Sequence, residues 1–567
     1  MKRLDLTING KLNTKHTKIF EDICSKNISS FTTLIGKISL NYKNNLDWHL
    51  SLPASRNTLI SDLFYYFCLV IFAKKILYDE KEIDEIYVDT PSIKNIITSI
   101  DNNIKISVKK NDNVFNKSID FFFLIAFTFH QILKRSFQLI IARAINQKNN
   151  YKIDTPINLI DTYVIPGFYS KDRYYSGLWE SLTSEEKKQT YFLPTIAYTK
   201  SKNMIKAYKE LRNSKRPFLI KEDFLKFSDI IYSVFHCIRI RSIKLDSILF
   251  DNINITSLFE NELKKRSGYH LAIEGLLNFR FLKRLKKAKI DIKVLLDWWE
   301  SQASDKGLHR GMKVFFPHSN VIGYLGYAPR NMELQLLPSI HETNNFLVPK
   351  YIAVIGKGLI KNLKFLNPEQ NVISAPAFRY QYLWNNYNKI NKTPVFNILV
   401  ALPITFEDTI YILNVVKKYF DMENKKNCNI LIKLHPTMSK NMLQRKFNYK
   451  FPKEFKLIFG SAKDYMLTAN VIISSMSIVC LESLALGIPV ILVKRPHGLN
   501  FNPIPHEIKE DLWKQCVNEI DIHSAINNFK NRDNFEIKRH NKIASEIRKN
   551  YFEPITRKGI ANLLDLN

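Results

Sequence analysis

The stretch that decides the fold is VIISSMSIVCLESLALGIPVILV (471–493), in which two apolar segments flank a short helical one. It predicts a strand over 469–475, a helix over 478–487 and a second strand over 489–495. The preceding chain continues the alternation of strand and helix, at 395–403, 409–420, 429–436 and 455–460. This order indicates a doubly wound parallel sheet, whose ligands bind at the carboxyl ends of the strands.

Polar side chains follow the apolar strand within this stretch. Ser474 and Ser475 end the strand, Ser477 can cap the helix, and Glu482 lies about one and a half turns into it. Hydroxyls and free backbone N–H groups at a helix N-terminus form a phosphate site that needs no metal, and Glu482 could then reach a ribose hydroxyl. The alternative is an ordinary serine N-cap with a solvated glutamate.

A second polar pair stands at the end of another predicted strand, in NILIKLHPTMSK (429–440). The strand ends at His435 and Pro436, and alternation along it places Lys433 and His435 on one face. A histidine there can donate a ring N–H to a phosphate oxygen, with the lysine adding charge. The pair is equally compatible with a simple strand-ending turn.

The His-Pro pair followed by SSMSIVCLESLALGIPVI (474–491) resembles the nucleotide-sugar domain of GT-B glycosyltransferases. More narrowly, it resembles bacterial enzymes of capsule and O-antigen synthesis that use cytidine nucleotides, namely Kdo, sialyl- and polysialyltransferases and CDP-glycerol polymerases. The resemblance covers about 395–500 and, weakly, 349–380. It implies an α/β GT-B fold, with two Rossmann-like domains facing a central cleft. It also implies donor binding by Lys433, His435, Pro436, Ser474, Ser475, Ser477 and Glu482.

The chain before residue 385 also alternates strands and helices. Strands are expected at 83–90, 157–167, 190–198, 293–300, 321–327 and 350–356, with helices between them such as 58–77. A segment rich in Pro and Asn from 363 reads as a linker. We therefore expect an acceptor-side domain over 1–385 and a nucleotide-sugar domain over 386–567.

Candidate catalytic residues follow the predicted strand 293–300. Glu300 ends that strand, and the polar loop after it holds Asp305 and His309. A carboxylate at a strand end is where an α/β enzyme places a general base. Glu300 is the first candidate, as base if the enzyme inverts or as nucleophile if it retains, with Asp305 and His309 second. Alternatively, Glu300 pairs with a neighbouring cation on the surface.

Candidate acceptor-binding residues lie in two further loops. The segment GFYSKDRYYSGLWESL (167–182) contains Asp172, Arg173 and Tyr175, and the loop at 48–57 contains Arg56. Mixed aromatic and charged side chains can stack on sugars and hydrogen-bond to them, although tyrosine-rich loops also serve as plain packing.

The chain has 567 residues and a net charge of +31, which favours anionic partners. A composition rich in Lys, Asn and Ile can produce such a charge without selection for an anionic ligand. No RRM, KH or helix-turn-helix signature is present in the sequence, so we expect no nucleic-acid partner. Six scattered cysteines without a CxxC pair indicate a reduced cytoplasmic protein. No Asp-x-Asp triplet occurs, so we expect neither a metal nor another cofactor.

Residues 118–146 are the part of the sequence that could cross or contact a membrane. The apolar run 118–133 is shorter than the ~18–20 residues that a span requires, so the segment is either a buried helix or an interfacial one. The start of the chain has no apolar signal region. These features, with the basic helix 280–289, predict a protein at the cytoplasmic face of the inner membrane, in contact with anionic lipid.

The resemblance thus implies a metal-independent glycosyltransferase that moves a sugar, best a CMP-sugar, to a lipid-linked or polymeric surface glycan. One alternative is a CDP-glycerol-type polyol-phosphate transferase, in which a histidine serves as base. Others are a non-enzymatic protein that binds nucleic acid or another polyanion, and a catalytically inactive GT-B scaffold.

Overall fold

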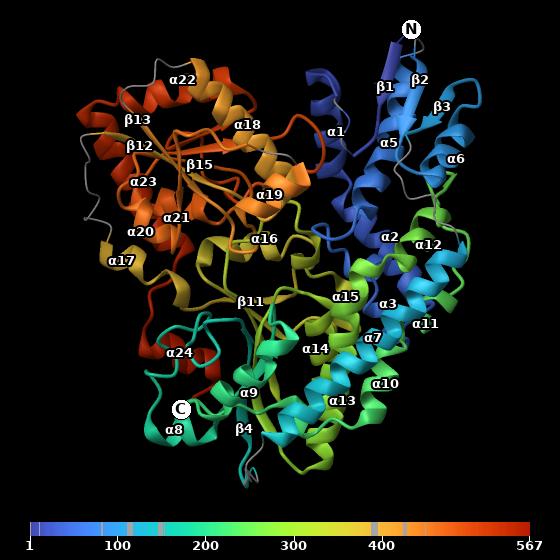
Figure 1. The fold of residues 1–567 in the computed structure, drawn as a ribbon, viewed down its shortest axis with the longest axis vertical. Helices are drawn as coiled ribbons and strands as arrows, with labels where there is room; N and C mark the ends of the chain where they lie inside the picture. The colour runs from blue at the N-terminus through green and yellow to red at the C-terminus, as the bar shows by residue number, and fades with distance from the viewer. Residues whose placement is uncertain are drawn as a thin grey trace.

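The computed structural model describes residues 2–8, 10, 12–80, 83–109, 117–145, 151, 153–386, 395–422, 428–447 and 450–566. Two six-stranded parallel sheets form the two large domains, and a three-stranded parallel sheet stands beside them at the N-terminus (Figure 1). The predicted fold class, α/β with two Rossmann-like domains, is confirmed by the two large sheets.

The second large domain contains the sheet ordered β14-β13-β12-β15-β16-β17. Its strands are β12 (Phe396–Ala401), β13 (Cys428–Lys433), β14 (Phe455–Ile458), β15 (Val471–Ser474), β16 (Val490–Val493) and β17 (Trp513–Cys516). Its helices are α18 (Phe406–Met422), α19 (Lys440–Phe447), α20 (Ala462–Met466), α21 (Val479–Leu486), α22 (Glu519–Lys530) and α23 (Asn534–Tyr551). The strand order reverses between β12 and β15, which is where such sheets bind ligands.

The first large domain contains the sheet ordered β11-β10-β9-β8-β4-β5. Its strands are β4 (Ile157–Val164), β5 (Thr190–Ile196), β8 (Ile292–Trp298), β9 (Asn320–Leu325), β10 (Tyr351–Val354) and β11 (Asn371–Ser374). The helices around it are α7 (Lys117–Ala144), α8 (Ser184–Gln189), α9 (Met204–Arg212), α10 (Phe227–Val234), α11 (His236–Arg239), α13 (Tyr269–Lys287), α14 (Ala303–Phe315), α15 (Ile340–Asn344) and α16 (Ile360–Leu363). Its order reverses between β4 and β8.

A smaller unit at the N-terminus has its own sheet and core. Strands β1 (Lys2–Asp5), β2 (Ile83–Val88) and β3 (Lys105–Val108) pair in parallel. Its helices are α1 (Thr14–Lys26), α2 (Ile28–Leu40), α3 (Leu46–His49), α4 (Leu52–Ser55), α5 (Leu63–Asp79), α6 (Pro91–Ile100) and α12 (Thr256–Lys264), and a short hairpin joins β6 (Leu249–Phe250) to β7 (Ile253–Asn254). The expected domain over 1–385 therefore contains two parallel sheets besides the short hairpin, and the smaller unit has a hydrophobic core of its own.

The connection between the large domains differs from the expected linker. The segment from residue 363 supplies β11, the edge strand of the first large sheet, and then the short helix α17 (Tyr382–Asn386). The rest of the expected linker, 387–394, lies outside the described residues. The last helix, α24 (Arg557–Leu564), returns to the first large domain, as Figure 1 shows, and it packs against β8. The chain therefore crosses between the two domains twice.

Helix α14, which follows the Glu300 loop, is held against α13 by a close backbone approach. A Cβ atom at Gly307 would lie 2.0 Å from the carbonyl oxygen of Gly275, which is too close for any side chain. Only glycine permits this contact. The contact fixes the start of α14 beneath the end of β8.

Helix α7 forms most of the segment 118–146, for which the sequence allows either a buried or an interfacial helix. One of its faces is buried, with Leu124, Gln131 and Leu139 among the buried residues, and the other face is exposed. No helix in the described ranges has the length and apolarity needed to cross a bilayer.

Candidate functional site

The second domain contributes His435, which stands two residues beyond the end of β13. Its Nδ1 atom lies 3.3 Å from the backbone N–H of Thr437 and 2.7 Å from the Thr437 hydroxyl. Because a backbone N–H can only donate, Nδ1 accepts, and the neutral ring carries its proton on Nε2. Burial, reinforced by the positive charges of Arg330, Lys433 and Arg173, lowers the pKa of His435 to about 4. At neutral pH the ring is therefore an N–H donor in a cationic environment.

The other residues of the His-Pro turn lie beside this ring. Burial lowers the pKa of Lys433, whose Nζ donates to the carbonyl of Leu434 at 3.0 Å. Pro436 is exposed and ends the strand ladder. Lys433 thus stands at the end of β13 and His435 two residues further on, each with its own local hydrogen-bond partner.

The serine run lies at the neighbouring strand end. The hydroxyl of Ser474 donates to the carbonyl of Ala401 at 2.5 Å and so joins β15 to β12. Ser475 is buried, and its Oγ atom is among the buried side-chain atoms of the described residues that have no hydrogen-bond partner. Ser477 is half-buried, and its Oγ accepts the N–H of Val479 at 3.4 Å, at the start of α21. Of the three serines, Ser475 is the one whose hydroxyl has no hydrogen-bond partner, and that oxygen atom is buried.

Glu482 lies on α21 and reaches the segment that joins the two domains. Its carboxylate accepts a hydrogen bond from the hydroxyl of Tyr382. Burial raises the pKa of Glu482, while Tyr382 and the charge of Arg379 oppose that rise. A ribose hydroxyl would therefore have to share or replace the Tyr382 contact.

The first domain contributes Glu300, which lies two residues beyond the end of β8. The indole N–H of Trp298 donates to its Oε1 atom at 2.9 Å. Burial raises the pKa of Glu300, and the charges of Arg379 and Arg330 partly offset that rise. A half-buried carboxylate with a raised pKa at a strand end is suited to act as a general base.

Two arginines connect the two halves of the site, and sequence reasoning missed both. Arg330 is close enough to influence the titration of both Glu300 and His435, which belong to different domains. Arg379 influences both Glu300 and Glu482, and its guanidinium stacks 5.8 Å from the ring centre of Trp298 and 5.7 Å from that of Tyr380. The charges of these two arginines therefore bear on strand-end residues of both large domains, and Arg330 is itself paired with Glu333 at 2.9 Å.

A signal for Arg330 was present in the sequence. It lies in the loop after β9, so the rule that selected Glu300 after β8 would also have selected it. The charge of Arg173, a predicted acceptor-binding residue, also contributes to the lowered pKa of His435. Its guanidinium lies 5.5 Å from the ring centre of Phe168.

Asp305 and His309, the secondary catalytic candidates, are held by the fold of the first domain. Asp305 is buried and accepts the backbone N–H groups of Glu300 and Gln302, both at 3.0 Å, which is the geometry of a helix cap for α14. His309 is buried between Asp297, 2.8 Å from Nε2, and the carbonyl of Leu347, 3.3 Å from Nδ1. We assign both residues structural roles, which leaves Glu300 as the catalytic candidate.

Three of the expected acceptor-binding residues are also engaged within the protein. Asp172 accepts the backbone N–H groups of Tyr174 and Tyr175, both at 2.8 Å, and pairs with Arg216 at 2.8 Å. Tyr175 is fully buried, and its hydroxyl lies 3.2 Å from the carbonyl of Asp161.

Arg56 is buried as well, and it pairs with Glu342, which also binds Lys306 at 2.8 Å. These contacts make Asp172 and Tyr175 organisers of their loop, and Arg56 part of a buried ion cluster.

Each large sheet reverses its strand order once, Tyr382 of the connecting segment hydrogen-bonds to Glu482 of the second domain, and α24 crosses back to the first domain. The fold is GT-B. No family model matches the sequence, and no curated protein matches it. The GT-B assignment therefore rests on the two sheets and their arrangement.

Solved structures are similar to this GT-B chain at low identity. A UDP-GlcNAc 2-epimerase from Neisseria meningitidis bound to UDP-GlcNAc is 12% identical, with a TM-score of 0.44 over 72% of this chain and 100% of that one. A trehalose 6-phosphate synthase from Burkholderia multivorans is 9% identical, with a TM-score of 0.41 over 73% and 96%. MurG from Acinetobacter baumannii is 9% identical, with a TM-score of 0.36 over 72% and 99%. No residue role is transferred at these identities.

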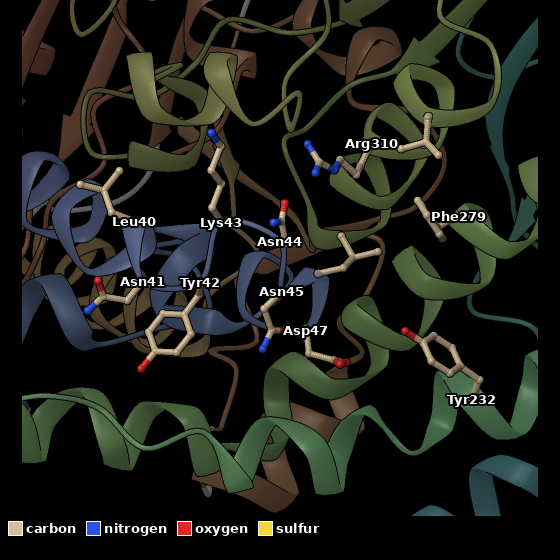
Figure 2. A pocket seen from close by; sticks show the side chains of 12 residues that line it. Leu40, Asn41, Tyr42, Lys43, Asn44, Asn45, Asp47, Tyr232, Phe279 and Arg310 are labelled. Carbon is tan, nitrogen blue, oxygen red and sulfur yellow. The ribbon is translucent and has the colours of Figure 1, made fainter.

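A large surface hollow lies outside the GT-B site. It has a volume of about 780 Å³ and is lined by the loop Leu40–Asp47 together with Tyr232, Phe279, Arg310 and Val314 (Figure 2). None of the strand-end residues described above lines it. We therefore place the functional site at the strand ends rather than in this hollow.

His49, close to the Arg56 cluster, gives a prediction for the pH dependence of stability. Burial lowers its pKa to about 4, below the ordinary value of 6.5. As the pH falls, the unfolded chain therefore binds a proton at His49 at a higher pH than the folded chain does. The stability that the neutral His49 contributes is complete above pH 6.5 and is lost as the pH falls towards 4. Between pH 7.5 and 5.0 we expect His49 to account for a loss of about 2 kcal/mol in the free energy of unfolding.

Urea unfolding of wild type and His49→Asn at the two pH values measures this loss. The variant should lose less stability on acidification than wild type, whereas the same change at the exposed His318 should leave the wild-type difference intact. Equal losses in wild type and His49→Asn would contradict the assignment.

Proposed function

We propose that this GT-B protein is a metal-independent glycosyltransferase that moves a sugar from a nucleotide donor to a glycan acceptor. The observation that carries the proposal is that the charge of Arg330, whose guanidinium pairs with Glu333 at 2.9 Å, influences the pKa of both Glu300 and His435, a carboxylate of one domain and an imidazole of the other. Glycosyl transfer needs these two elements, a base or nucleophile beside the anomeric carbon and positive charge at the departing phosphate.

The donor phosphate is best placed between His435, Ser475 and the N-terminus of α21. The Nε2–H group of His435 and the unpartnered hydroxyl of Ser475 would donate to phosphate oxygens, and the backbone N–H groups and dipole of α21 add to the attraction. Arg330 and Arg173 would neutralise the charge that develops as the nucleotide leaves. This arrangement supports a reaction without a metal, in keeping with the lack of an Asp-x-Asp triplet.

The resemblance of the His-Pro and serine motifs favours a CMP-sugar as the donor. It favours a lipid-linked or polymeric bacterial surface glycan as the acceptor. A polyol-phosphate transferase would use a histidine as base. The Nδ1 atom of His435 already accepts from Thr437, and its Nε2 atom carries the proton, so this ring is poorly placed to take another one. Glu300 as the base and a sugar as the transferred group fit this protonation better.

Thermal stabilisation by a panel of CMP, CDP, UMP, UDP, GDP and dTDP, with and without EDTA, tests the proposal. A ligand at 100 times its dissociation constant stabilises by about 2.7 kcal/mol. We expect a shift with cytidine nucleotides that EDTA does not change and that His435→Ala reduces. The matched control is His506→Ala, because the side chain of His506 is 78% exposed. No shift with any nucleotide would contradict the proposal, and a shift selective for UDP or dTDP would contradict the cytidine donor.

A further inference from the structure

The outer face of α7 is a continuous apolar stripe. Six large apolar side chains, each 46% to 70% exposed, recur at intervals of three or four residues: Phe122, Ile125, Phe129, Leu133, Phe137 and Ile140. This spacing places them on one side of the helix, along about 27 Å of its length. Isolated exposed apolar side chains are ordinary, but a stripe of this size marks an interaction surface.

The opposite face of α7 is anchored to the first domain. Phe127 packs against the rings of Tyr269 and His270 on α13, with centroid distances of 6.0 Å and 5.1 Å. Arg135 forms an ion pair with Glu274 at 2.8 Å. These contacts set the orientation of α7 about its own axis, so the apolar stripe faces away from the first domain.

Helix α10 and the short helix α11 extend this surface. Helix α10 packs against α7, and Figure 1 shows both on the outside of the first domain, away from the second. Phe227, Ile231, Phe235 and Ile238, again three or four residues apart, are 38% to 50% exposed. We call these four residues and the six of α7 the apolar face.

The charges around the apolar face are cationic. The nearby carboxylates of Asp120 and Asp229 are held in ion pairs, with Arg241 at 2.6 Å and Arg284 at 2.7 Å respectively. The guanidinium of Arg266 lies 4.9 Å from the ring centre of Phe123 on α7, and α13 ends in the exposed Lys286 and Lys287. Asp120 lies against both Arg241 and Arg266, and Asp229 against both Arg280 and Arg284, so each of these carboxylates is outnumbered by arginines, while Lys286 pairs with Asp291 at 3.6 Å.

We propose that the apolar face lies flat on an anionic lipid bilayer, with its aromatic and aliphatic side chains at the boundary between headgroups and acyl chains. Apolar burial combined with attraction of cations to anionic headgroups is how interfacial helices bind membranes. The net charge of +31 fits this occupant and disfavours a second copy of the chain, because two such copies repel each other. The proposal does not depend on the nucleotide site, so the two can fail separately.

Sedimentation with vesicles tests the proposal. We expect wild type to bind vesicles that contain phosphatidylglycerol, to bind pure phosphatidylcholine vesicles at least tenfold more weakly, and to lose affinity as salt increases. The double variant Phe122→Ser/Phe129→Ser should bind the anionic vesicles at least about tenfold more weakly, because each phenylalanine removed from the interface costs a measurable part of the binding energy.

The matched control is Phe459→Ser/Phe535→Ser, since these two phenylalanines are 78% and 74% exposed but lie in the second domain. It should bind within twofold of wild type, and all three proteins should share one melting temperature. Equal binding by the two double variants, or no binding by wild type, would overturn the proposal. A concentration-dependent dimer in analytical ultracentrifugation that only Phe122→Ser/Phe129→Ser abolishes would also overturn it, in favour of a second copy.

Discussion

Glu342→Gln is expected to lower the free energy of unfolding by about 3–5 kcal/mol, the cost of leaving buried charges without their counter-ion. Glu342 is buried between Arg56 and Lys306, which are buried themselves. Burial alone would raise the pKa of Glu342, but the two cations outweigh it and lower that pKa to about 2. The carboxylate is therefore charged at every pH at which the protein is handled, and its removal leaves two buried cations facing each other.

Urea unfolding at pH 7.5 measures this effect. Glu185→Gln serves as the control, because the Glu185 side chain is 80% exposed, and it should change stability by less than about 0.5 kcal/mol. The double variant Lys306→Met/Glu342→Gln should be more stable than Glu342→Gln alone, since one of the two unpaired cations is gone. A Glu342→Gln protein as stable as wild type would contradict the structural role of the cluster and return Arg56 to the list of acceptor-binding residues.

Glu300→Gln is expected to reduce turnover by about 10²–10⁴-fold, the usual contribution of a positioned general base. The substitution keeps the size of the side chain and can still accept the Trp298 indole hydrogen bond, so the local structure should persist. Affinity for the nucleotide should stay within about twofold, because the donor phosphate is assigned to the other domain. The measurement is release of nucleotide from the donor, alongside the dissociation constant of the nucleotide alone.

Glu180→Gln is the control for this experiment, since Glu180 lies in the expected acceptor-side loop and is exposed. Full turnover in Glu300→Gln would remove Glu300 from the mechanism. Loss of nucleotide affinity together with turnover would instead show that the residue acts through the fold of the site. The anomeric configuration of the product then separates a base, which gives inversion, from a nucleophile, which gives retention.

The sequence predicts the second domain well because its signals are local. The five strands predicted between 395 and 495 each have their own apolar pattern and are present, whereas β17 and the helices after it were not predicted. His435 and Ser475 are found by following a predicted strand to its carboxyl end. The same rule finds Glu300. It does not distinguish a ligand-facing carboxylate from one that caps the next helix, and Asp305 is of the second kind.

Other parts of the site could not be predicted, because they depend on distant residues meeting. Arg56 and Glu342 are separated by 286 positions, and their pairing leaves no trace in either local pattern. Arg379 lies in a segment that reads as a linker, yet it stacks on Trp298 and faces Glu482 from the other domain. Likewise, the sequence leaves the apolar run of α7 open between a buried and an interfacial helix, and the structure shows one face buried and the other exposed.

The most direct measurement of the central claim is a crystal structure of the protein with the nucleotide that stabilises it most. We expect the nucleotide between the two large domains, with phosphate oxygens within ~3 Å of His435 Nε2 and Ser475 Oγ and beside the Arg330 guanidinium. A nucleotide bound elsewhere, for instance in the hollow lined by Tyr42, Tyr232 and Arg310, would contradict it.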